Sequence, residues 1–97
     1  MFKQVKLHNE VNLVGRMIDC KNIEYNNIRT IELTLAIPND DIKLEPNILP
    51  IYIYDDGKIS SNFKKYQAIA INGHIENNNG QHIIADVLSI IKEPLFN

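Results

Sequence analysis

The stretch NEVNLVGRMID, residues 9–19, decides the fold because its side chains alternate with a period of two. Val11, Leu13 and Gly15 fall on one side of this repeat, and Arg16 falls on the other. A period of two is typical of a half-buried β-strand. Glycine in the inward phase predicts a sharp bend and a close approach of another backbone. Arginine in the outward phase is the first candidate for a binding residue.

The composition limits the size and class of the protein. Its 97 residues fit one domain, 1–97. The content of hydrophobic residues, 44%, and of charged residues, 23%, is typical of a globular protein. No apolar run is long enough to span a membrane, no signal peptide opens the chain, and one cysteine excludes an internal disulfide. We therefore expect a cytoplasmic protein without a membrane partner. The net charge of −2 disfavours nucleic acid as a partner, although a local basic groove matters more than the sum.

Five segments carry the pattern of β-strands. They are residues 3–18, 28–37, 49–54, 68–76 and 81–92. The second is the clearest, because Ile31, Leu33 and Leu35 face one way while polar residues alternate with them. The phase of the first segment also places Val5 and Leu7 inward.

The connections between these segments have distinct chemistry. A polar, Asn-rich turn occupies residues 20–27, and an acidic loop with three prolines runs from 38 to 50. Residues 55–66 predict a short helix, because Ile59, Phe63 and Tyr66 form one apolar stripe at helical spacing. Asn79-Gly80 predicts a type I′ hairpin between the last two strands.

The order of elements is three strands, a short helix and two strands. An open five-stranded antiparallel sheet would leave two unpaired edges, so closure into a barrel is favoured. The order matches the OB-fold, an all-β, five-stranded Greek-key barrel, here with a short helix between strands 3 and 4. An open meander with the helix packed on one face is the alternative.

The residues also resemble a known family. NEVNLVGRM is similar to the opening strand of bacterial single-stranded DNA-binding proteins, which reads roughly N-x-V-x-L-V-G-R-L. LTLAI, residues 33–37, resembles the family's F-T-L-A-V strand, and Tyr54 stands where its third strand ends in an aromatic residue. The pair Lys64-Lys65 and Gly73 match a basic pair and a glycine in the next strand.

This resemblance implies an OB-fold that binds single-stranded DNA without strong sequence preference. Such binding combines a basic groove with aromatic platforms on which bases stack. It further implies a homo-oligomer, dimer or tetramer, with replication proteins as possible partners. The resemblance implies that DNA binding would act in replication, in recombination or in the transfer of a mobile element or phage.

The outward residues of the third strand and of the first are the leading candidates for contact with DNA. Tyr52 and Tyr54 are two residues apart and suited to stacking on bases, although cross-strand packing is the alternative role for both. Arg16 is suited to clamping a phosphate, and its alternative role is a salt bridge with Asp19 or Glu32.

Four further residues are weaker candidates for DNA contact. Lys64 and Lys65 fall at the end of the expected helix, where its dipole also favours cations. His74 and His82 come from the two strands of the last hairpin and are expected to lie nearly opposite each other across it. No cysteine or carboxylate stands beside them at ligand spacing, so we expect no metal site. No catalytic or cofactor motif occurs in the chain, so we expect neither an enzyme nor a cofactor.

The net acidity and the loss of aromatic residues lead to a second hypothesis, an OB-fold adaptor that binds a protein of a replication or primosome-type complex. The chain has no tryptophan, its last hairpin loop is reduced to NNNG, its 38–50 loop is acidic, and it ends at KEPLFN without an acidic tail. In this hypothesis the surface that would bind DNA serves a protein partner instead. A structural subunit without binding activity is a third interpretation.

Overall fold

Five β-strands close into a barrel in the computed structural model, which describes residues 7–39, 41, 43–54 and 63–93. The strands are β1 (Val11–Tyr25), β2 (Ile28–Ile37), β3 (Asn47–Tyr54), β4 (Ala68–Asn77) and β5 (Gln81–Ile90). Around the barrel they follow the order β1-β2-β3-β5-β4. All neighbours are antiparallel except β3 and β5, which are parallel. This arrangement confirms the all-β barrel and excludes the open meander.

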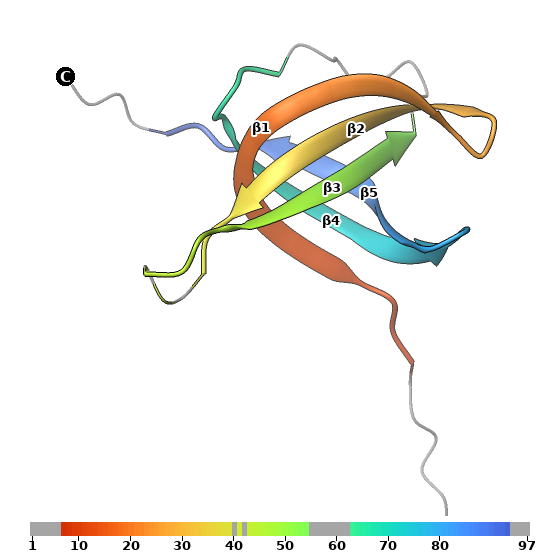
Figure 1. The fold of residues 1–97 in the computed structure, drawn as a ribbon, viewed down its shortest axis with the longest axis horizontal. Coiled ribbons are helices and arrows are strands. Elements are labelled where there is room, and N and C mark those ends of the chain that lie inside the picture. Colours follow the sequence, from red (N-terminus) through yellow and green to blue (C-terminus); the bar gives the residue numbers. More distant parts are fainter. Residues whose placement is uncertain (1–6, 40, 42, 55–62, 94–97) are drawn as a thin grey trace, which may run out of the picture.

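The first strand closes the barrel because it pairs with two neighbours in succession. Residues 11–16 pair with β4, and residues 16–25 pair with β2. Figure 1 shows β1 curving over the barrel as it passes from one neighbour to the other. A register shift between Met17 and Asp19 marks a β-bulge at this point, and bulges bend a strand.

Two glycines stand where backbones approach most closely. A Cβ on Gly15 would lie 2.8 Å from the carbonyl oxygen of Ala36, which confirms the close approach predicted for this residue. A Cβ on Gly73 would lie 1.9 Å from the carbonyl oxygen of Ile84, well inside van der Waals contact. Both positions therefore accept only glycine without a shift of the backbone.

The core is formed by the inward residues of all five strands. They are Met17, Ile31, Leu33, Leu35, Ile51, Ile53, Ile69, Ile71 and Ala85. The inward phase predicted for Ile31, Leu33 and Leu35 is confirmed, and the one predicted for Leu7 is wrong. Leu7 lies before β1 and is 87% exposed, and Ile75 is exposed near the end of β4. Val5 lies outside the described residues.

The predicted boundaries of the first strand are wrong at both ends. The strand begins at Val11 rather than residue 3, and it continues to Tyr25 through the segment that we assigned to a turn. The turn is only Asn26-Asn27, and both residues have positive φ, 53° and 60°. Asparagine tolerates this conformation, which a two-residue hairpin of type I′ requires. The bulge changes the phase of the strand, so its two halves do not share one alternation.

The predicted helix is not supported by the described part of its segment. Residues 55–62 lie outside the described ranges, and residues 63–67 form a turn with Tyr66 at a φ of 69°. Tyr66 donates its backbone N–H to the carbonyl oxygen of Met17 (2.6 Å), and Met17 donates to Gln67 (2.9 Å). Hydrogen bonds to the β1 bulge therefore replace helical ones here. Across the described ranges, no helix is long and apolar enough to cross a membrane.

The connection between β4 and β5 lies where the sequence predicts it, with one residue more. Asn79 and Gly80 both have positive φ, as expected. Asn77 pairs with Gln81, so three residues, 78–80, form the loop instead of the two of a type I′ turn.

Candidate nucleic-acid interface

An aromatic cluster lies on the outer surface of the barrel, where β1, β3 and β5 come together. Its members are Tyr25, Tyr52, Tyr54 and His82. Tyr25 stacks on Tyr54 with ring centroids 6.2 Å apart and an interplanar angle of 20°, and Tyr52 stacks on His82 at 5.1 Å and 22°. Tyr25 joins the two pairs, because its centroid lies 4.8 Å from Tyr52 and 5.0 Å from His82.

This cluster lies outside the barrel core and covers a second buried layer. Thr30 and Ile84, opposite Tyr54 and Tyr52 in the sheet, are 2% and 1% exposed although neither belongs to the core cluster. Tyr25 itself is 9% exposed, and its hydroxyl has no hydrogen-bond partner among the described residues. A buried hydroxyl without a partner destabilises the fold unless another group satisfies it.

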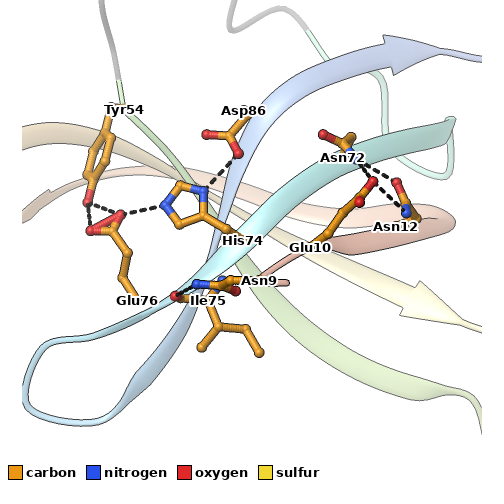
Figure 2. Close-up of polar contacts among 9 residues, drawn as sticks. All are labelled: Asn9, Glu10, Asn12, Tyr54, Asn72, His74, Ile75, Glu76 and Asp86. Atoms are coloured by element: carbon orange, nitrogen blue, oxygen red, sulfur yellow. Dashed lines mark hydrogen bonds and ion pairs between the residues drawn. The ribbon is translucent and has the colours of Figure 1, made fainter. Parts of the chain in front are cut away.

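A chain of polar contacts extends from the cluster across β4 and β5 (Figure 2). Tyr54 donates its hydroxyl to Glu76, with distances of 3.1 Å and 3.0 Å to the two carboxylate oxygens. His74 Nε2 lies 3.1 Å from Oε2 of Glu76, and its Nδ1 lies 2.8 Å from Oδ2 of Asp86. One imidazole thus holds two carboxylates in fixed positions beside the tyrosine.

These contacts shift the proton affinities of the groups involved. Burial, followed by the hydrogen bond and charge of Glu76, raises the pKa of Tyr54 to about 12. The hydrogen bond to Asp86, supported by Glu76 and opposed by burial, raises the pKa of His74 above its ordinary value. Burial and the charge of Glu32 raise the pKa of Tyr52. The two tyrosines therefore remain neutral at neutral pH.

A second candidate surface lies at the other end of the strands, where β4 begins and β5 ends. Lys64, Lys65, Tyr66 and residues 90–93 line a groove of about 470 Å³ together with Gln67. Tyr66 is 60% exposed, and the Lys65 ammonium lies 5.2 Å from the centre of its ring. The two lysines suit an anionic ligand such as a phosphate, and the exposed ring offers a surface for a cation or a stacked group.

Arg16 borders this groove and already has an anionic partner. Its guanidinium donates two hydrogen bonds to Glu93, at 2.6 Å and 2.9 Å, and a third to the carbonyl oxygen of Tyr66 at 3.1 Å. The salt bridge predicted as the alternative role of Arg16 therefore exists, but with Glu93 instead of Asp19 or Glu32. Glu32 pairs with Lys21 at 3.3 Å.

The candidate residues from the sequence therefore separate into two groups. Tyr52, Tyr54, His74 and His82 belong to the aromatic cluster and its polar chain, whereas Arg16, Lys64 and Lys65 belong to the basic groove. His74 pairs with Ile84 and His82 pairs with Glu76, so the two histidines lie near each other across the hairpin, offset by two positions rather than directly opposite. Among the described residues, no group of three or more His, Cys, Asp or Glu side chains is arranged to hold a metal ion.

Three residues of the cluster region were not predicted from the sequence. Tyr25 was assigned to a turn, and recognising Asn26-Asn27 as a two-residue hairpin would have placed it in a strand. The contacts of Glu76 with Tyr54 and of Asp86 with His74 carry no local signal because they depend on strand pairing, although Glu76 stands two residues from His74 on the same face of β4.

A third surface is an apolar patch on the outer face of β1, β4 and β5. Val14 and Val87 are 57% and 59% exposed, and with Ala70 they line a shallow pocket of about 330 Å³. Asn72 borders this patch and donates to Glu10 (3.0 Å) and Asn12 (2.7 Å), as Figure 2 shows. Exposed apolar patches on a sheet are typical of contacts with another protein chain.

Comparison with known proteins shows which fold this is. No protein-family model and no curated protein sequence matches the chain. Among solved structures, one similar protein is the N-terminal domain of PriB from Thermoanaerobacter tencongensis, whose structure is described as dimeric. Its sequence is 22% identical and its TM-score is 0.67, and the match covers 88% of this chain and 98% of that one. The mitochondrial single-stranded DNA-binding protein Rim1 of S. cerevisiae is 14% identical with a TM-score of 0.73, and the match covers 88% of this chain and 97% of that one.

The single-stranded DNA-binding protein of Thermus aquaticus is 16% identical with a TM-score of 0.69, and the match covers 93% of this chain and 43% of that one. The chain therefore has the OB-fold of single-stranded DNA-binding proteins. The resemblance stated from the sequence is confirmed as a likeness of fold.

The polar contacts of His74 with Glu76 and Asp86 predict a pH dependence of stability. His74 has a raised pKa in the folded state, so protonated His74 stabilises the fold below about pH 6.5, its unfolded pKa. This contribution is lost as the pH rises through the folded pKa. The unfolding free energy of the wild type should therefore fall, relative to His74→Gln, as the pH rises above about 6.5.

Urea unfolding at several pH values measures this difference. His8→Gln, which removes an exposed histidine before β1, controls for the loss of any histidine. A difference between wild type and His74→Gln that is the same at every pH would contradict the role of the polar chain.

Proposed function

We propose that this protein binds single-stranded DNA through the aromatic cluster. OB-folds bind oligonucleotides on the face of strands 2 and 3, between the loop that joins strands 1 and 2 and the loop that joins strands 4 and 5. Tyr25 stands at the first of these loops and His82 at the second, with Tyr52 between them. The position of four aromatic rings on this face carries the proposal. The likeness to single-stranded DNA-binding proteins supports it.

Within this mechanism, bases stack on the partly exposed rings of Tyr52, Tyr54 and His82. The buried Tyr25 ring holds the others in place, so the platform is preorganised and loses little side-chain entropy on binding. Stacking tolerates any base because every base has a π-face.

The basic groove supplies the phosphate contacts. Lys64 and Lys65 attract the DNA backbone, and Arg16 exchanges the carboxylate of Glu93 for a phosphate. This exchange is inexpensive because both partners of the salt bridge are about half exposed, and exposed pairs contribute little to stability. The strand would thus run from the aromatic cluster at one end of the barrel toward the groove at the other.

Truncation of a platform tyrosine tests the stacking mechanism. Tyr54→Ala should weaken the binding of labelled oligo-dT roughly fivefold to 150-fold, the equivalent of about 1–3 kcal/mol for one stacked base. Tyr54→Phe keeps the ring and should bind within about twofold of wild type. Fluorescence anisotropy at low salt measures both. Unchanged affinity in Tyr54→Ala would exclude stacking on this ring.

Removal of the lysine pair tests the phosphate contacts. Each phosphate that the protein neutralises makes the slope of log affinity against log salt concentration steeper, by about 0.9 for duplex DNA and by about 0.7 for single strands. Lys64→Ala with Lys65→Ala should therefore reduce this slope by about 1.4 if both lysines contact phosphates. Lys43→Ala, in the acidic loop, is the matched control. A double variant that keeps the wild-type slope would exclude these lysines from the interface.

We also propose that the protein forms a homo-oligomer through the apolar patch around Val14 and Val87. Val14→Asp with Val87→Asp would bury two charges in that contact and should dissociate the protein to single chains. Leu44→Asp, an equally exposed apolar residue elsewhere, should leave the mass unchanged. Light scattering gives the masses, and a wild-type mass of one chain would overturn this part of the proposal.

A protein–protein adaptor is the second candidate function. Three carboxylates, Glu32, Glu76 and Asp86, surround the aromatic cluster, and the chain carries a net charge of −2, which favours a cationic partner. If no oligonucleotide binds at about 50 mM salt, where phosphate contacts are strongest, this function replaces DNA binding.

A further inference from the structure

The carboxylates beside the aromatic cluster have acceptor capacity that the fold does not use. Asp86 contacts His74 through Oδ2, and its Oδ1 has no hydrogen bond among the described residues, while the side chain is 51% exposed. Glu76 accepts from Tyr54 at both oxygens and is in contact with His74 through Oε2 only. Each carboxylate oxygen has two lone pairs, so Glu76 also keeps a free acceptor site on Oε1.

These acceptors are fixed in place next to the stacking platform. His74 holds Glu76 and Asp86 from opposite sides of its ring, as Figure 2 shows. Glu76 lies at the hydroxyl edge of Tyr54, so a base stacked on that ring would bring its own edge near the carboxylate. The donors of the platform are meanwhile occupied, because Tyr54 and His74 both direct theirs to these carboxylates.

An independent observation also points to a ligand at this place. The hydroxyl of Tyr25 is buried within the same cluster, and the residue is nine-tenths buried with no partner for that oxygen in the described ranges. Buried polar atoms in folded proteins are almost always hydrogen-bonded. The rings around it would have to shift for a polar ligand edge to reach and satisfy it.

The chemistry of the bases then decides which edge fits. Cytosine and adenine present an exocyclic amino group on the Watson–Crick edge, and guanine presents an amino group beside a ring N–H. Thymine presents two carbonyl oxygens on either side of one N–H. An acceptor carboxylate pairs with an amino group, as Asp and Glu do with cytosine N4, but repels a carbonyl oxygen.

We infer that Glu76 and Asp86 select bases that carry amino groups, so that the protein binds cytosine, adenine and guanine in preference to thymine. This inference rests on the proposed binding of single-stranded DNA at the cluster and names the bases that the site prefers. It departs from purely stacking proteins, whose modest preferences follow stacking strength and backbone flexibility. Glu76 and Asp86 act here as specificity-determining residues that contact the base edge.

Three pyrimidine oligonucleotides of about 20 nucleotides, longer than one OB-fold site, provide the test. Oligo-dC carries a 4-amino group and an acceptor N3 where oligo-dT carries a 4-carbonyl and an N3–H. Oligo-dU lacks the thymine methyl group, so it separates the effect of the base edge from that of the methyl group. At neutral pH and fixed salt, oligo-dC should bind roughly tenfold more tightly than oligo-dT, within the range for one good base-edge contact. Oligo-dU should bind like oligo-dT.

Amide substitutions then assign the preference to the two carboxylates. Glu76→Gln with Asp86→Asn removes two negative charges, so every oligonucleotide should bind more tightly, while the ratio of oligo-dC to oligo-dT affinity should fall toward one. Asp86→Asn alone changes a half-exposed side chain and should lower the ratio without disturbing Tyr54. Asp19→Asn, an exposed carboxylate on β1, should preserve the ratio.

The outcomes separate this inference from the proposed function. If oligo-dT binds as tightly as oligo-dC, or if the amide variants keep the wild-type ratio, the base preference is wrong and DNA binding stands. If no oligonucleotide binds at low salt, both are wrong. A preference for oligo-dC that falls in both amide variants supports both.

Discussion

The pairing of β1 with two neighbours is the constraint on which the rest of the structure depends. Arg16 stands opposite Ala68 of β4 and also opposite Ala36 of β2, so one strand closes the barrel at this residue. That requires a bend, which the bulge after Met17 provides, and a backbone approach that Gly15 permits. Without closure, both edges of the sheet would remain unpaired.

Closure also creates the aromatic cluster. The parallel pairing of β3 with β5 brings Tyr52 beside His82, although these residues belong to separate hairpins. The long second half of β1 carries Tyr25 to the same face. The rings then bury Ile84, so that β5 has apolar contacts on both of its faces. The same packing that stabilises this side of the barrel therefore builds the surface proposed to stack bases.

Aromatic rings and positive charge lie in different parts of the molecule. Carboxylates surround the aromatic cluster, whereas the lysine pair and Arg16 gather where β4 begins and β5 ends. Many nucleic-acid-binding surfaces combine both kinds of residue in one groove. In the proposed mechanism, this separation would assign base contact and phosphate contact to separate surfaces, and the base contact would depend on hydrogen bonding as well as stacking.

The sequence by itself determined the strands, the alternation of Ile31, Leu33 and Leu35 into the core, and the outward direction of Tyr52 and Tyr54, because a period of two is a local property. It did not reveal the end of β1, because the bulge changes the phase of that strand. It also did not reveal the turn at residues 63–67, where hydrogen bonds to β1 replace helical ones. Only the tertiary structure decided that Glu76 contacts Tyr54 and that Glu93 contacts Arg16. Those pairs are 22 and 77 residues apart in the chain, and strand register around a closed barrel is what brings them together.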